Sequence, residues 1–165
     1  MERQPLWTRN FTILTLGTVV SMLGNAISGF ALSLLILDYT GSTLLYAIFM
    51  VVYNLPKIIM PSIAGPYLDR FSRTKAIWTL DYLSAALYLV IFFLLRGGLF
   101  NYALLLGLCI VIGTIDSVYL VAYDSLYPML ISEGNYAKAY SISSMIYPLS
   151  ALMVPIASWC YEHVG

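Results

Sequence analysis

Four polar side chains lie inside long apolar stretches of this sequence, and the chemistry open to them is binding and proton transfer. They are Asn25, Tyr53, Lys57 and Asp116. Charged groups within a membrane-spanning segment are costly, and they usually face a bundle interior or a water-filled cavity. If these stretches cross a bilayer, the four side chains are the candidates for contact with a substrate or a proton.

Lys57 and Asp116 each have more than one interpretation. Lys57 lies about 15 residues into its apolar stretch, near the bilayer middle, and it shares a helical stripe with Tyr53. It lines a functional cavity, or it forms a purely structural ion pair. Asp116 is a proton site, a counter-charge for a substrate, or the partner of Lys57. Asn25 is a further candidate, with an interhelical hydrogen bond as its alternative role.

The sequence carries no arrangement typical of an enzyme. Cys109 and Cys160 lie in separate apolar stretches without metal-ligand spacing, and the spacing of Asp116 and Asp124 does not make a catalytic pair. A nucleophile–base pair and a phosphate-binding glycine loop are also missing. We therefore expect no catalytic residue, no bound metal and no cofactor, and we expect that the protein is not an enzyme.

Composition places the chain in a membrane. Of its 165 residues, 61% are apolar and 10% are charged, whereas soluble domains carry about 25% charged residues. Eight Lys and Arg balance eight Asp and Glu, so there is no basic excess for a nucleic-acid partner. The partner that fits this composition is the lipid bilayer.

Five stretches are long enough to cross a bilayer as helices. A span needs about 20 apolar residues, and the expected helices cover approximately 10–37, 42–68, 76–95, 99–127 and 137–161. We predict an all-α polytopic membrane protein in which residues 1–165 form a single transmembrane domain. The first stretch runs for about 28 residues, much longer than the apolar part of a signal peptide, so we expect it to remain as a helix.

Lys and Arg residues in the loops indicate the orientation. With a cytoplasmic N-terminus, the inside segments hold Arg3, Arg9, Arg70, Arg73, Lys75 and Lys138. The outside segments hold Arg96 alone. Because cytoplasmic loops carry an excess of Lys and Arg, we predict that the N-terminus is cytoplasmic.

The fifth stretch places small or kinking residues at steps of three and four, so they share one helix face. They are Ala137, Ser141, Ser144, Pro148, Ala151, Pro155 and Ser158. Small residues let membrane helices approach closely, which makes helix packing one interpretation of this face. The other is a face that slides or rocks during transport, and two prolines within one helix favour some flexibility.

The segment GPYLDRFSRTK, from Gly65 to Lys75, resembles the signature loop between the second and third helices of the major facilitator superfamily. The matching residues are Gly65, Asp69, Arg70, Arg73 and Lys75. The segment lies between the second and third expected spans, on the predicted cytoplasmic side. It departs from the usual pattern at Ser72, where the family has glycine.

Two further stretches are similar to the branch of that superfamily that holds macrolide-efflux and enterobactin-exporter proteins. One is the first helix, with Leu16-Gly17, Ser21, Leu23-Gly24 and Ile27-Ser28. The other is the junction of the fourth and fifth helices, AYDSLYPML from Ala122 to Leu130.

The resemblance implies two six-helix halves that rock around a central site, with this chain supplying helices one to five of the first half. It implies efflux of a small molecule by a proton-coupled carrier in the plasma or inner cell membrane. Substrate would then contact Asn25, Tyr53, Lys57 and Asp116. It also implies a cytoplasmic gate in which Arg73 of the signature loop pairs with Asp124.

A structural or assembly role remains open. The chain would then be a truncated product or a subunit of a split transporter, with no transport of its own. Its partner would be the missing C-terminal half or a second subunit. The identity of the substrate, the direction of transport and its ion coupling do not follow from the residues.

Overall fold

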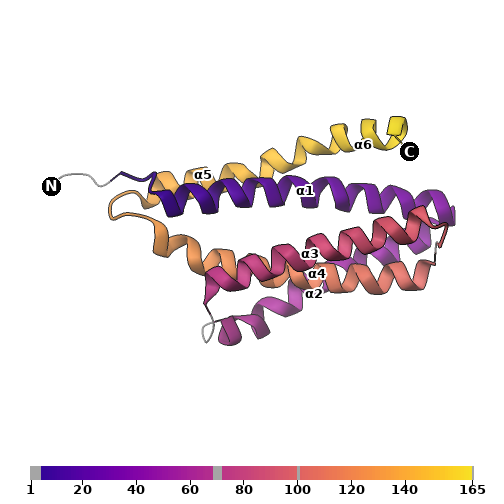
Figure 1. Ribbon diagram of the computed structural model, residues 1–165, viewed down its shortest axis with the longest axis horizontal. Coiled ribbons are helices and arrows are strands. Elements are labelled where there is room, and N and C mark those ends of the chain that lie inside the picture. The colour runs from indigo at the N-terminus through magenta and orange to yellow at the C-terminus, as the bar shows by residue number, and fades with distance from the viewer. Residues whose placement is uncertain (1–4, 69–71, 100, 165) are drawn as a thin grey trace. The chain divides into compact units, whose positions relative to one another are not determined.

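The computed structural model describes residues 5–68, 72–99 and 101–164, and these are almost entirely helical (Figure 1). The helices are α1 (Arg9–Thr40), α2 (Thr43–Leu68), α3 (Arg73–Arg96), α4 (Tyr102–Leu126), α5 (Tyr136–Ala151) and α6 (Met153–Val164), with a short 3-10 helix, η1 (Tyr127–Leu130), after α4. Within these residues there is no strand, and five segments are long and apolar enough to cross a membrane. The predicted all-α polytopic fold class is therefore confirmed, while the orientation of the N-terminus stays a prediction.

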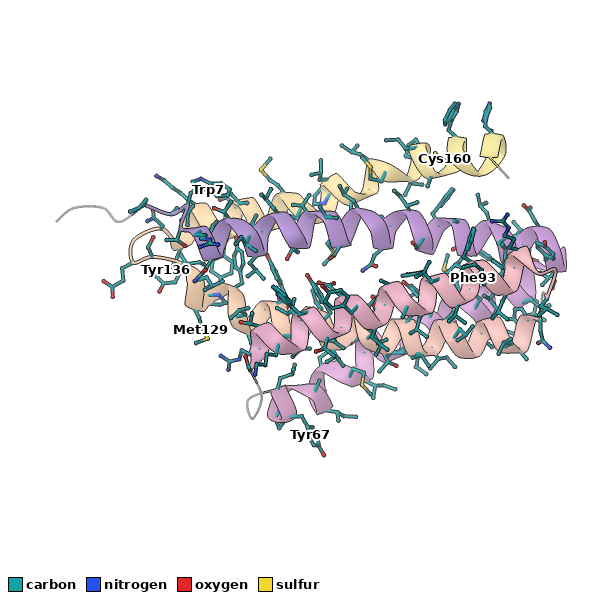
Figure 2. The ribbon with its side chains drawn as sticks, in the orientation of Figure 1. Trp7, Tyr67, Phe93, Met129, Tyr136 and Cys160 are labelled. Atoms are coloured by element: carbon teal, nitrogen blue, oxygen red, sulfur yellow. The ribbon has the colours of Figure 1, made fainter. Side chains whose placement is uncertain are left out.

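Apolar side chains project outward from these helices. Among the residues labelled in Figure 2, Tyr67 on α2 is 64% exposed and Phe93 on α3 is 65% exposed. Exposed apolar surface on this scale marks a contact with membrane or protein. In a chain with five spans, lipid is the solvent that this surface fits.

The fifth span differs from the single helix that the sequence predicts. α5 ends at Ala151 and α6 begins at Met153, with the Leu152 N–H bonded to the Leu149 carbonyl. The physical reason is Pro155, which has no N–H to donate to the Ala151 carbonyl, so the helical ladder is interrupted there. Residues Tyr136–Cys160 together are still long enough to cross a membrane.

Glycine allows the tight turns between α1 and α2 and between α3 and α4. Gly41, between α1 and α2, has φ +59°, and Gly98, between α3 and α4, has φ +71°. Residues with a side chain rarely adopt such angles. The Gly98 N–H also bonds to the Leu95 carbonyl, which closes the turn after α3.

The chain forms two compact units. The first combines Met1–Tyr39 with Tyr127–Gly165, and the second is Thr40–Leu126. The expectation of a single transmembrane domain over residues 1–165 stays a prediction.

An aromatic cluster fastens the start of α1 to η1 and α5 in the first unit. Phe11 is completely buried, and its ring centre lies 5.5 Å from those of Trp7 and Tyr127. The Tyr127 ring lies 6.0 Å from that of Tyr140, and its hydroxyl donates a 2.6 Å hydrogen bond to the Ala139 carbonyl. Aromatic pairs at these distances stabilise a fold beyond the area they bury.

In the second unit, α4 packs against both α2 and α3 (Figure 1). Tyr102 at the start of α4 donates a 2.8 Å hydrogen bond to the Leu45 carbonyl at the start of α2. Further along both helices, Ser117 donates a 3.2 Å hydrogen bond to the Pro56 carbonyl. The contacts follow the same order along α2 and α4, so these two helices run parallel. α3 connects them in the opposite direction.

Candidate functional site

Gly113 brings the backbones of α2 and α4 into contact near the middle of both helices. A Cβ atom on Gly113 would lie 2.6 Å from the Tyr53 carbonyl oxygen, closer than real Cβ atoms come to any neighbour. One turn later on α4, the buried Ser117 hydroxyl bonds to the Pro56 carbonyl. Small residues four apart are a common means of close helix contact in membranes. The contact sets the position of the side chains beside it.

Tyr53 joins the two charged candidates at this contact. Its hydroxyl donates a 3.1 Å hydrogen bond to Asp116 Oδ2. Lys57 Nζ lies 4.6 Å from the centre of its ring, within the distance of a cation–π interaction. Phe49 stacks on the same ring, with the two centres 5.7 Å apart. We name Tyr53, Lys57 and Asp116 the Tyr53 cluster.

The members of the Tyr53 cluster differ in exposure. Tyr53 is 9% exposed, and Asp116 is half-buried at the contact between α2 and α4. Lys57 is exposed, and its charge interacts electrostatically with Asp116. A cation at mid-helix depth does not face lipid without large cost. The Lys57 ammonium therefore faces water or another part of the protein.

The structure brings together three of the four predicted contact residues. Asn25 lies on α1, in the first unit, where it is half-buried. Neither the sequence stripe nor the spacing of Asp116 predicted a hydrogen bond between Tyr53 and Asp116. With that bond, Tyr53 lies against both charges, one on its hydroxyl and one on its ring face.

The described residues of the signature segment lie on α2 and α3. Gly65 is half-buried near the end of α2, Arg73 is half-buried as the first residue of α3, and Lys75 is exposed. Asp69 and Arg70 lie outside the described residues.

The proposed partner of Arg73 is Asp124, which is exposed two residues before the end of α4. Because α3 runs opposite to α4, its first turn lies at the same end of the second unit as the last turn of α4. This placement is compatible with a gate at that end. The pairing of Arg73 with Asp124 stays a prediction.

Gly113 and Ser117 build the close contact beside the Tyr53 cluster, and neither was predicted from the sequence. Their spacing of four residues on α4 is a usable signal, because small residues four apart let membrane helices approach closely. Phe49, which is 1% exposed, was not predicted either. One phenylalanine in an apolar stretch carries no signal of the residue that it stacks on.

Comparisons with known proteins cover nearly the whole chain. A model of the Major Facilitator Superfamily matches residues 14–165. The uncharacterized MFS-type transporter YkuC of Bacillus subtilis (strain 168) is 28% identical over 159 residues, which make up 95% of this chain and 36% of that protein. The chain thus spans little more than a third of the length of this relative. No solved structure matches the chain.

Proposed function

The chain belongs to the Major Facilitator Superfamily, and we propose that it is the N-terminal part of a carrier that moves a small molecule across a membrane. This family is one of transporters, which confirms the expectation that the protein is not an enzyme. The observation that carries the proposal is the Tyr53 cluster, where a cation and a carboxylate meet one tyrosine at mid-helix depth. Such groups within a membrane mark a substrate or proton pathway.

The mechanism that we propose is alternating access, in which the two halves of the carrier rock around a central site. Lys57 and Asp116 contact the substrate or the transported proton in this site. Tyr53 holds both groups in register through its hydroxyl and its ring. Tyr53 itself and Asn25 of α1 are the other two substrate contacts in the proposal.

We further propose a direction and an energy source for transport, namely efflux driven by protons. It is supported by the likeness of the first helix and of the Ala122–Leu130 segment to the macrolide-efflux and enterobactin-exporter branch. The proposed location is the plasma or inner cell membrane, with a cytoplasmic N-terminus. The excess of Lys and Arg in the loops on that side supports this orientation.

The cytoplasmic gate is a separate part of the proposal. We assign it to the signature segment and to Asp124, with Arg73 as the partner of this aspartate. Both residues lie at one end of the second unit, on helices that pack together. A charge pair there would break and re-form as the carrier changes its open side.

A subunit of a split transporter, or a truncated product with a structural or assembly role, is the second candidate. The chain spans 36% of the length of the YkuC protein, and in this candidate that span is a separate polypeptide. The remaining helices of a carrier would then come from another polypeptide. Co-purification of a tagged chain with such a polypeptide, followed by mass spectrometry, separates this candidate from a single-chain carrier.

Transport by charge variants of the full-length gene product tests the main proposal. Inverted membrane vesicles are energised with a proton gradient, and the uptake of amphipathic fluorescent dyes is measured. We expect Lys57→Gln and Asp116→Asn each to lower the rate at least about tenfold, because each removes a charge that acts on substrate or proton. The control is Arg96→Gln, which removes an exposed charge at the end of α3. Wild-type rates in both variants would remove the Tyr53 cluster from the mechanism.

A further inference from the structure

Lys57 is the charge of the Tyr53 cluster that an incoming molecule meets first. Its side chain is exposed, whereas Tyr53 is 9% exposed and Asp116 is half-buried. Across residues 5–68, 72–99 and 101–164, Lys57 Nζ contacts the Tyr53 ring and takes part in no hydrogen bond or ion pair. Its three N–H donors are therefore open to a ligand.

The carboxylate of the cluster is occupied from the protein side. Asp116 Oδ2 accepts the Tyr53 hydroxyl, at a point where α2 and α4 touch through Gly113. Asp116 is also less exposed than Lys57, so Lys57 is the more accessible of the two charges.

Asn54 adds a second donor beside Lys57. The two residues are three apart on α2, so they lie on neighbouring positions of one helix face, and both are exposed. Asn54 Nδ2 donates one hydrogen to the Met50 carbonyl, at 2.8 Å. The other hydrogen of this amide is left for a ligand, since an amide nitrogen carries two.

We infer that the site takes an organic anion, whose carboxylate, sulfonate or phosphate group pairs with Lys57 Nζ and Asn54 Nδ2. The inference rests on the proposed transport function and adds the charge class of the substrate to it. An anion gains a charge-assisted hydrogen bond from Lys57 without disturbing the bond between Tyr53 and Asp116. A cation gains neither contact and is repelled by the exposed ammonium.

The test measures the sign of the electrostatic potential at the site, and it needs no known substrate. In the full-length gene product, Cys109→Ala and Cys160→Ser remove the native thiols of this chain, and Asn54→Cys supplies one reporter thiol. Two membrane-impermeant methanethiosulfonates are compared, one carrying a sulfonate and the other a trimethylammonium group. Each reaction rate is measured with Lys57 present, with Lys57→Gln and with Lys57→Arg.

We expect the ratio of the anionic to the cationic rate to fall about tenfold in Lys57→Gln, because one unit charge acts with opposite sign on the two reagents. Lys57→Arg keeps the charge and should keep the ratio. Arg96→Gln, at the end of α3, is the control and should leave the ratio unchanged.

Two other outcomes would overturn different parts of the account. If the thiol reacts but Lys57→Gln leaves the ratio unchanged, the organic-anion inference is wrong, while the proposed transport site stands. If neither reagent reacts at Asn54→Cys, the position is not in contact with water, and both the inference and the proposed site fail.

Discussion

Tyr53 uses two different parts of one side chain to hold two opposite charges. Its hydroxyl donates to the Asp116 carboxylate, and its ring face lies below the Lys57 ammonium. Donation to a carboxylate increases the electron density of the ring, which strengthens the attraction of a cation to its face. The three groups therefore act together. Loss of the Asp116 charge would weaken the attraction between Lys57 and the Tyr53 ring.

Replacement of Tyr53 by Phe separates the two roles, because it removes the hydroxyl and keeps the ring. We expect Tyr53→Phe to lower the free energy of unfolding in detergent micelles by about 1 kcal/mol, the usual size of an interhelical hydrogen bond in a membrane protein. A double-mutant cycle with Asp116→Asn measures the interaction free energy between Tyr53 and Asp116. Additive effects of the two single variants would show that the bond contributes nothing to stability.

The residues of the Tyr53 cluster could be predicted from the sequence, but their contact could not. The lysine and the aspartate stand out in apolar stretches because each charge is expensive there, and the tyrosine shares a helical stripe with the lysine. Which of them meet depends on which face of α2 turns toward α4. That choice is made by the close approach at Gly113 and by the Ser117 hydrogen bond, and both depend on tertiary packing.

At the scale of elements, α2 and α4 are joined along the middle section of α2. α2 contains Pro56, Pro61 and Pro66, yet it is continuous from Thr43 to Leu68. Each proline removes one backbone hydrogen bond of the helix. α4 adds a hydrogen bond from Ser117 to the Pro56 carbonyl and passes close to the same section through Gly113.

The close approach of α2 and α4 gives a matched pair of glycine variants on one helix. We expect Gly113→Ala to lower the free energy of unfolding by about 1–3 kcal/mol, because the new Cβ forces two backbones apart. Gly107→Ala is the control, since a Cβ there meets nothing within 4 Å; it should be neutral or stabilising, as alanine favours a helix over glycine. Detergent unfolding followed by circular dichroism checks both, and equal stabilities would contradict the close contact.

The spans were predicted better than their ends and breaks. Length and apolar character suffice to find a membrane span. In lipid, the backbone N–H and C=O groups must form their hydrogen bonds within the segment, and a helix allows this. The interruption at Leu152 was not predicted, although the two prolines that flank it were noted for flexibility. Whether a proline bends or interrupts a helix depends on the packing around it.

At the scale of the whole molecule, the loops must alternate between the two sides of the membrane. The predicted orientation puts Ser72, before α3, in the cytoplasm and Leu99, after α3, outside. Both residues are exposed, and Ser72 makes no capping hydrogen bond from its side chain. They are therefore suited to carry single thiol labels.

We expect Ser72→Cys to react with an impermeant maleimide only in inverted vesicles, and Leu99→Cys only in right-side-out vesicles. The physical reason is retention of Lys and Arg on the cytoplasmic side. Both variants are made in the background without Cys109 and Cys160. The reverse pattern would place the N-terminus outside and the signature segment on the wrong side for the proposed gate.

In the proposed carrier, the Tyr53 cluster lines a water-filled path that opens to each side of the membrane in turn. The direct measurement is the reactivity of Asn54→Cys toward an impermeant thiol reagent, applied from each side of the membrane to the full-length gene product. Ile59→Cys is the control, because Ile59 is 44% exposed and lies on the opposite side of α2 from Asn54 and Lys57, at about 100° of rotation per residue. It is expected to face lipid, where thiols scarcely ionise. We expect Asn54→Cys to react from both sides at least about tenfold faster than Ile59→Cys, since only the thiolate in water is reactive. A rate no faster than that of Ile59→Cys from either side would contradict the proposed path.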